Sequence, residues 1–164
     1  MADRLRRLDL SQIRSQRVHR LLGYWRSKIG TQGSVPRRSD IDPTELPDLL
    51  PNLMLLDVER DPLRFRYRLV GTRVVDFSYH DFTGTYLDEA GWVEVKGFTR
   101  AYVDAVTDRK PTGGFYLWEL RSGAPGTCEF ALFPLSDEQG EISHVLAIED
   151  YDFPLIDIDP DKMY

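Results

Sequence analysis

The segment Phe65-Arg66-Tyr67-Arg68-Leu69-Val70-Gly71-Thr72 decides how the rest of the chain is interpreted. Apolar and charged residues alternate over residues 65–69, a pattern typical of a half-buried strand. The apolar run before it, residues 53–59, ends at Asp61-Pro62, a pair that favours a turn. We therefore expect these two runs to form an antiparallel hairpin that ends at Gly71-Thr72.

After this hairpin the pattern is first helical and then extended. Residues 73–79 predict a short helix, and residues 92–108 predict a longer one, with apolar side chains at helical spacing. Three strands are then predicted over residues 115–120, 127–135 and 142–150, separated by loops rich in Gly, Ser and acidic residues.

Before the hairpin, an amphipathic helix is predicted, with Gly30 as its stop signal. Its apolar residues fall on one stripe, at positions i, i+3, i+4, i+7 and i+11: Val18, Leu21, Leu22, Trp25 and Ile29. This stripe must be covered, so these five residues form the predicted partner interface unless the chain's own sheet covers them. Residues 1–10 either extend the helix or fray.

The predicted elements define an α+β fold, with a five-stranded antiparallel sheet, helices on one face and an N-terminal amphipathic helix. Apolar residues occupy both faces of the last strands, so the second face also needs a cover, and the N-terminal helix is the obvious one. We expect an N-terminal helix and linker over residues 1–35, the main domain over residues 36–150, and an acidic tail over residues 151–164.

Length and composition restrict the class of protein. A chain of 164 residues fits one domain. No run approaches the roughly 18 apolar residues that a membrane span requires. The single cysteine, Cys128, excludes an internal disulfide and a zinc site with several cysteines. We expect a protein of the reduced cytoplasm.

Charge is distributed unevenly along the chain. The first 30 residues carry a net charge of +6 and the rest carry −12. Such a basic arm suits nucleic acid or an anionic membrane, or it packs on its own acidic body or that of a second copy. Because the acidic body repels phosphate, we expect packing, and nucleic acid is not an expected partner.

Several segments resemble a bacterial family of short, stand-alone PAS-domain proteins. They are Arg38-Ser39-Asp40-Ile41-Asp42-Pro43, Leu49-Leu50-Pro51, the segment 65–72, Thr83-Gly84 before Tyr86-Leu87-Asp88, and Phe133-Pro134-Leu135-Ser136 before Gly140. The resemblance runs from about Leu22 to Asp150, and the element order is that of a PAS domain. It implies a signalling or scaffolding domain, often dimeric, with a small cavity between sheet and helices.

Aromatic residues are the candidates for lining that cavity, because pockets for small molecules are mostly apolar with few polar groups. The predicted ligand-binding residues are Tyr67, Phe77, Tyr79, Phe98, Tyr102, Phe115, Trp118 and Phe130. The alternative interpretation of each residue is an ordinary place in a filled core.

Cofactor and metal signals are weak. A flavin photosensor of this family needs a reactive cysteine in its helical region, whereas Cys128 begins a predicted strand and is expected to be buried. A PAS domain that binds haem usually has a histidine on its long helix as the axial ligand, and the long helix predicted here has no histidine. The three histidines of the chain, His19, His80 and His144, are scattered. The cofactor is therefore unknown. No motif for a nucleotide-binding loop or a hydrolase is present.

Three acidic or basic groupings remain. Asp40, Asp42, Glu45 and Asp48 lack the spacing of a calcium loop, and Asp42 and Glu45 are expected to cap the turn at Pro43, so no metal site is predicted.

Asp57 and Glu59 lie on the same face of a predicted strand. They are interpreted either as an acid–base pair or as the solvated end of that strand. Arg66 and Arg68 lie on the face opposite Tyr67 and are expected to pair with Asp57, Glu59 or Glu149, the alternative being an anion site.

The resulting hypothesis is a stand-alone PAS sensor or adaptor that signals through ligand or protein binding and catalyses no reaction. Its expected partners are a second copy, other signalling proteins and a small-molecule ligand. The alternatives are a constitutive dimerisation or scaffold module with a filled core, and a small α+β enzyme such as an isomerase, which would need a buried acid–base pair.

Overall fold

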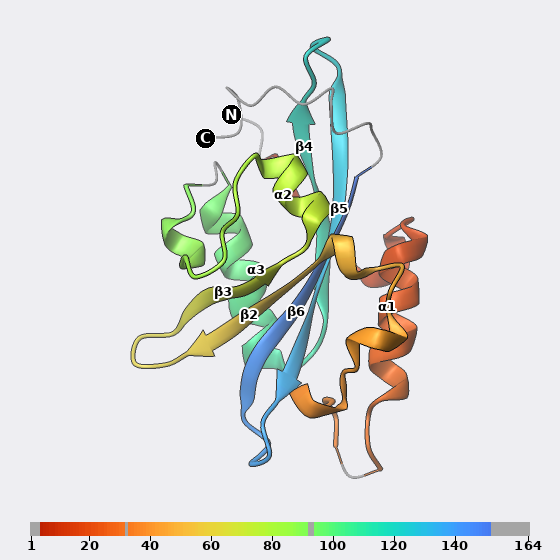
Figure 1. The fold of residues 1–164 in the computed structure, drawn as a ribbon, viewed down its shortest axis with the longest axis vertical. Coiled ribbons are helices and arrows are strands. Elements are labelled where there is room, and N and C mark those ends of the chain that lie inside the picture. The colour runs from red at the N-terminus through yellow and green to blue at the C-terminus, as the bar shows by residue number, and fades with distance from the viewer. Residues whose placement is uncertain (1–3, 32, 92–93, 152–164) are drawn as a thin grey trace.

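The computed structural model describes residues 4–31, 33–91 and 94–151, and these residues form an antiparallel sheet with helices on both faces (Figure 1). The sheet has six strands in the order β1-β4-β5-β6-β2-β3. Their bounds are Leu5–Leu8 (β1), Leu53–Glu59 (β2), Arg64–Val70 (β3), Thr112–Glu119 (β4), Pro125–Ser136 (β5) and Ile142–Tyr151 (β6). The helices are α1 (Gln16–Ser27), α2 (Thr72–Ser78) and α3 (Val95–Asp108), joined by short 3-10 turns.

The α+β fold and the five predicted strands are confirmed. β2 and β3 form the predicted hairpin, with a bulge at which Arg68 has no register partner, because Leu55 pairs with Leu69 and Leu56 with Tyr67. The long predicted helix corresponds to α3; its expected first residues, 92–93, lie outside the described residues. β6 includes Tyr151, the first residue of the predicted tail, and the rest of that segment, residues 152–164, lies outside the described residues.

A sixth strand, β1, stands where a helix extension or fraying was expected. It pairs with the edge strand β4, where Arg6 faces Phe115 and Arg7 faces Gly114. The approach depends on glycine, because a Cβ at Gly114 would meet the carbonyl oxygen of Arg6. The pairing covers the exposed backbone edge that β4 would otherwise present to solvent.

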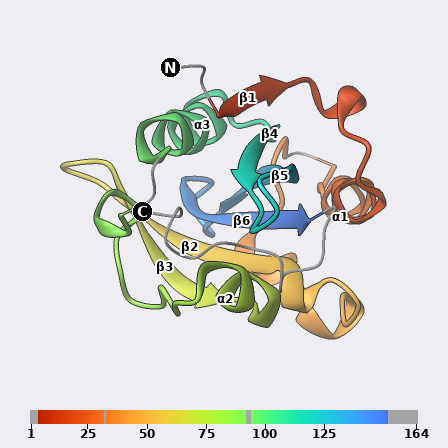
Figure 2. The same ribbon diagram turned by 90° about the horizontal axis from the view of Figure 1, so that it is seen from above.

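The two faces of the sheet are covered by different helices. α3 packs on β4, β5 and β6 on what we call the inner face, whereas α1 packs on β5 and β6 on the outer face. Figure 2 shows α1 and α3 on opposite sides of these strands. The inner layer holds most of the aromatic core, and the outer layer is built on α1.

The stripe of α1 predicted as a partner interface is packed against the chain's own sheet. Val18, Leu21, Leu22 and Trp25 are buried, and Ile29 packs partly against the same core. The Trp25 ring lies 6.0 Å from that of Phe133 on β5, and its Nε1 donates a 3.0 Å hydrogen bond to the Pro134 carbonyl. In this arrangement the stripe is not available to a partner.

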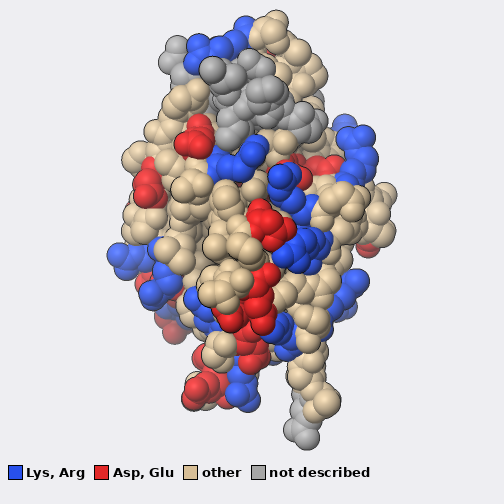
Figure 3. Space-filling view, turned by 45° about the vertical axis from the view of Figure 1, so that its right-hand side comes forward, with Lys and Arg blue, Asp and Glu red and all other residues tan. Residues whose placement is uncertain are grey.

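The basic arm packs on the acidic body of the same chain, as expected from the uneven charge. Its ion pairs are Arg7–Asp104 (3.0 Å), Arg14–Glu129 (3.6 Å), Arg17–Asp150 (3.1 Å), Arg20–Asp48 (2.6 Å) and Lys28–Glu45 (2.9 Å). Figure 3 shows acidic and basic side chains next to one another on the side that carries α1. Among the described residues, no helix is both long and apolar enough to cross a membrane.

Candidate functional site

Four of the eight predicted ligand-binding residues surround one small cavity between the inner face and α3. Tyr67 comes from β3, Phe98 and Tyr102 from α3, and Phe130 from β5. The cavity measures about 10 Å³. That volume holds about one water molecule, because a buried water needs roughly 10–15 Å³. The other lining residues are Met54, Leu87, Tyr116, Leu132, Ala147, Ile148 and Glu149.

The other four predicted residues lie elsewhere. Phe77 of α2 and Trp118 of β4 are buried and in edge contact, with ring centroids 5.6 Å apart, beside the cavity but not lining it. Tyr79 follows α2 in a left-handed conformation and is 52% exposed. Phe115 is half-buried and, being adjacent to the inward Tyr116, faces the outer side.

Sequence reasoning missed three residues of this region: Tyr116, Glu149 and Tyr151. The Tyr116 ring meets Phe98 edge-on at 5.1 Å, and the Tyr151 ring stacks on Phe77 at 4.5 Å. The alternation of side chains along β6 could have identified two of them, because it places Glu149 and Tyr151 on the same inner face as Ala147. Glu149 had been considered only as a partner for Arg66 or Arg68, which lie on the other face.

Glu149 is the polar centre of the inner core. It is 7% exposed and forms no ion pair with any described residue, and its Oε2 accepts a 2.6 Å hydrogen bond from the Tyr151 hydroxyl. Burial raises the pKa of the Glu149 carboxyl, and the hydrogen bond from Tyr151 acts in the opposite direction. Burial also raises the pKa values of the Tyr116 and Tyr151 phenols, which therefore stay protonated.

This arrangement can hold a proton and offer hydrogen bonds to a small polar group. The Glu149 carboxyl donates when protonated and accepts when ionised, and the phenols beside it are potential donors. Among the described residues, no histidine lines the cavity, so the groups available there are a carboxyl and phenols.

The basic residues of β3 are engaged on the outer face. The expected ion pair of Arg68 with Asp57 is present at 2.8 Å, and His144 Nε2 lies 3.1 Å from the same carboxylate. Burial lowers the pKa of His144. Arg66 forms no ion pair with an acidic residue of the described ranges, and its Nε donates to the Gly84 carbonyl at 3.2 Å.

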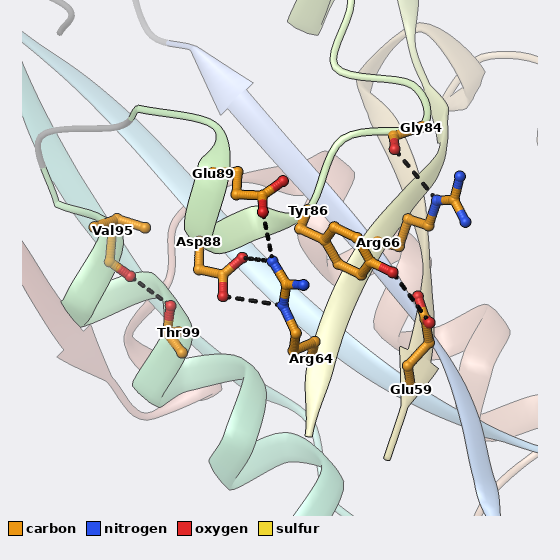
Figure 4. A network of polar contacts seen from close by, with 9 residues as sticks. All are labelled: Glu59, Arg64, Arg66, Gly84, Tyr86, Asp88, Glu89, Val95 and Thr99. Carbon is orange, nitrogen blue, oxygen red and sulfur yellow. Dashed lines mark hydrogen bonds and ion pairs between the residues drawn. The ribbon is translucent and has the colours of Figure 1, made fainter. Parts of the chain in front are cut away.

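A polar network fastens the loop after α2 to the free edge of β3 (Figure 4). Arg64 binds Asp88 at 2.7 Å and Glu89 at 3.0 Å, and its guanidinium carbon lies 3.6 Å from the centre of the Tyr86 ring. The Tyr86 hydroxyl donates to Glu59 at 3.2 Å. Glu59 and Asp57 therefore have separate partners and do not form an acid–base pair.

The residues considered for cofactors and metals have structural partners. Cys128 is fully buried within β5. His80 is exposed and meets the Phe82 ring edge-on at 4.9 Å, outside the core cavity. No group of three His, Cys, Asp or Glu side chains suited to a metal occurs in the described ranges.

The acidic cluster before β2 is used for turns and ion pairs. Asp42 accepts from the Thr44 N–H at 2.9 Å, as a cap of the turn Pro43–Glu45. Glu45 does not close the predicted capping box, because it binds Lys28 while the Asp42 N–H donates to the Tyr24 hydroxyl at 2.9 Å.

Comparison with known proteins identifies the family of this fold. The chain matches the family model described as PAS domain over residues 13–148. No curated protein matches it. Similar solved structures include an RNA-binding light-oxygen-voltage receptor, with 13% identity and a TM-score of 0.49 over 81% of this chain and 38% of that one.

Two further similar structures are bacterial. The PAS domain of a protein from Colwellia psychrerythraea has 12% identity and a TM-score of 0.45, over 67% of this chain and 97% of that one. A sensory box sensor histidine kinase from Vibrio cholerae has 18% identity and a TM-score of 0.47, over 68% and 90%. The chain spans only 38% of the light-oxygen-voltage receptor. Because the family model covers residues 13–148, which include α1, α2, α3 and most of the sheet, the chain belongs to the PAS domain family.

Proposed function

We propose that this PAS domain is a signalling adaptor that acts through protein contacts, with the docking of α1 on the outer face as its switch. The observation that carries the proposal is the filled inner core. Its cavity of about 10 Å³ is far smaller than the roughly 300–1,000 Å³ of ordinary ligand pockets. A domain with a filled core signals through its surface and needs no catalytic step.

The docking of α1 rests on apolar burial. Arg17 and Arg20, which pair with Asp150 and Asp48, have side chains almost half exposed. Exposed ion pairs of this kind contribute about 0–1 kcal/mol each. Burial of Val18, Leu21 and Trp25 therefore decides whether α1 stays on β5 and β6.

Release of α1 would uncover an apolar surface on the outer face that includes Phe133. Such a surface is the kind that binds protein partners. In this proposal residues 1–35 form the regulatory unit and residues 36–150 the body. The uncovered body then binds a second copy or another signalling protein, by a shift of an existing equilibrium.

A change of Trp25→Ala tests the switch. It removes the ring that packs on Phe133 and the hydrogen bond to Pro134, so it weakens docking of α1 while leaving the inner core intact. We expect the variant to self-associate more than the wild type, measured as mass by light scattering across a concentration series. Gly23→Ala is the control, because Gly23 is exposed on α1 and has open space around it.

Circular dichroism and thermal melting must accompany the masses, so that a folded variant is compared with a folded wild type. A folded Trp25→Ala protein with wild-type mass at every concentration would rule out the switch.

A second candidate function, a small-molecule sensor, is supported by Glu149. A buried carboxyl with no ion pair among the described residues, which shares its cavity with the phenols of Tyr67, Tyr102 and Tyr116, suits a ligand that carries a hydrogen-bond donor. Native and denaturing mass spectra of freshly purified protein, with an absorption scan, separate the two functions. Extra non-covalent mass or a chromophore supports the sensor; a bare polypeptide mass supports the adaptor.

A further inference from the structure

A second hollow, which we call the outer groove, lies on the face of the sheet that carries α1. It measures about 200 Å³ and runs between the 3-10 turns of residues 38–50 and strands β2, β3 and β6. Its floor is a row of three leucines across those strands, Leu146, Leu55 and Leu69. Met54 is common to the linings of this groove and of the inner cavity, and the other lining residues of the two hollows differ.

The outer groove exposes apolar side chains to solvent. Leu69 is 59% exposed and Leu50 is 41% exposed, and both line it. Large apolar side chains gathered in a hollow, and not scattered singly, mark a binding site for a ligand or for another macromolecule.

Polar side chains lie on the same strands outside the lining of the groove. Asp57 pairs in register with His144 on β6, two residues along the strands from the pair Leu55–Leu146. Asp57 also binds Arg68, so its negative charge is already matched. His144 has a lowered pKa, with burial as the largest cause and the positive charges of Arg38 and Arg68 contributing. Arg68 lies beside this pair through its 2.8 Å contact with Asp57.

Within the part of the chain that the structure describes, Arg38 is the one cationic side chain that lines the groove, and its guanidinium has no acidic partner there. It is half-buried, and no hydrogen bond or ion pair is formed by its side chain with any described residue. A guanidinium binds a carboxylate through two parallel hydrogen bonds, and removal from water strengthens that contact. Among the described residues, the groove thus combines an apolar floor with one cationic side chain in its lining, that of Arg38.

We propose that the outer groove binds a small apolar monocarboxylate, with the carboxylate on Arg38 and the hydrocarbon tail on Leu55, Leu69 and Leu146. The volume of about 200 Å³ lies below the range of drug-sized pockets, which favours a medium-length chain over a long lipid. The proposal goes beyond the adaptor function, since it requires neither an inner ligand nor movement of α1.

Octanoate is the probe, titrated into the full-length isotope-labelled protein and followed by NMR and calorimetry. We expect saturable shifts at Leu55, Leu69 and Leu146, and none at Glu149. The uncharged analogue 1-octanol should bind about tenfold to a hundredfold more weakly, because a hydrogen bond to a charged group contributes roughly 1.5–3 kcal/mol.

Arg38→Gln should weaken octanoate binding by a similar factor. Arg37→Gln, the same charge change at an exposed neighbour outside the groove, should leave it unaltered. Leu69→Ala removes an exposed side chain from the floor and should also weaken binding. The spectrum of each variant without ligand shows whether it is folded.

The proposal would be overturned by the absence of a saturable shift with octanoate, by equal affinity in Arg38→Gln, or by shifts centred on the inner core. Shifts at Leu69 that depend on protein concentration without any ligand would assign the groove to a second copy, and this too would overturn it.

Discussion

The Tyr151 hydroxyl donates a 2.6 Å hydrogen bond to the carboxylate of Glu149, two residues before it on β6, within the inner core. Both side chains are buried, and Glu149 has no ion pair among the described residues. A carboxyl in this position makes the stability of the fold depend on pH, and the tyrosine limits that dependence.

Glu149→Gln should remove a loss of unfolding free energy that grows as pH rises. Because burial raises the pKa of Glu149 in the folded state, the folded protein binds this proton more tightly than the unfolded chain does. Stability from this group is therefore present at low pH and is lost as pH rises from the unfolded value of about 4.3 through the folded pKa. In urea unfolding between pH 4 and pH 8, the variant should gain stability relative to the wild type as pH rises. A difference that stays constant with pH would contradict the assignment.

Tyr151→Phe should have the opposite pH dependence. The variant loses a donor to the ionised carboxylate, which raises the pKa of Glu149 further. The loss of unfolding free energy should grow with pH, towards the roughly 1.5–3 kcal/mol of a hydrogen bond to a charged group. The same urea series measures it. A loss that is as large at pH 4 as at pH 8 would mean that the ring contact with Phe77, and not the hydrogen bond, dominates.

Gly71→Ala should destabilise the fold strongly. A Cβ at Gly71 would meet the backbone carbonyl oxygens of Leu50 and Pro51, which belong to the turn before β2 and cannot move aside as a side chain could. We expect a loss of about 1–3 kcal/mol or more in unfolding free energy. Gly23→Ala is the matched control and should stabilise α1 by about 0.5–1 kcal/mol, since its Cβ meets open space. Equal effects of the two changes in thermal melts would refute this account of Gly71.

The hairpin, the long helix and the last three strands could be predicted because their periodicity reflects which side faces the core. The strand predicted from residues 65–72 is confirmed for this reason. Gly71 in this segment also has a steric role, because the backbone of Leu50 and Pro51 lies close to its Cα. Four of the eight predicted cavity residues are adjacent for the same reason: alternation and helical spacing place Tyr67, Phe98, Tyr102 and Phe130 on facing surfaces.

The rest depended on contacts between distant parts of the chain. Phe115 was selected by composition, although the strand places it on the face opposite Tyr116. Glu149 was overlooked because a single carboxylate within an apolar strand gives no sign of a partner until Tyr151 is placed beside it. The outer groove forms only when the turns before β2 fold across the sheet, and no local pattern encodes that.

The strand β1 illustrates the same limit and yields the last prediction. Leu5 and Leu8 stand at the helical spacing i, i+3 and do not alternate, so the local pattern does not predict a strand; its place is set by Gly113-Gly114, more than 100 residues away. Gly114→Ala puts a methyl group against the Arg6 carbonyl and should detach β1 from β4. We expect the amides of β1 to lose protection in hydrogen exchange, while those of β2, β3 and β6 keep it. Gly33→Ala is the control. A Cβ at Gly33 would lie 3.6 Å from the carbonyl oxygen of Val35, which is an ordinary van der Waals distance. Retained protection at Arg6 and Arg7 in the Gly114→Ala protein would show that β1 is held by its contacts with α3 through Leu5, and that the paired backbone is secondary.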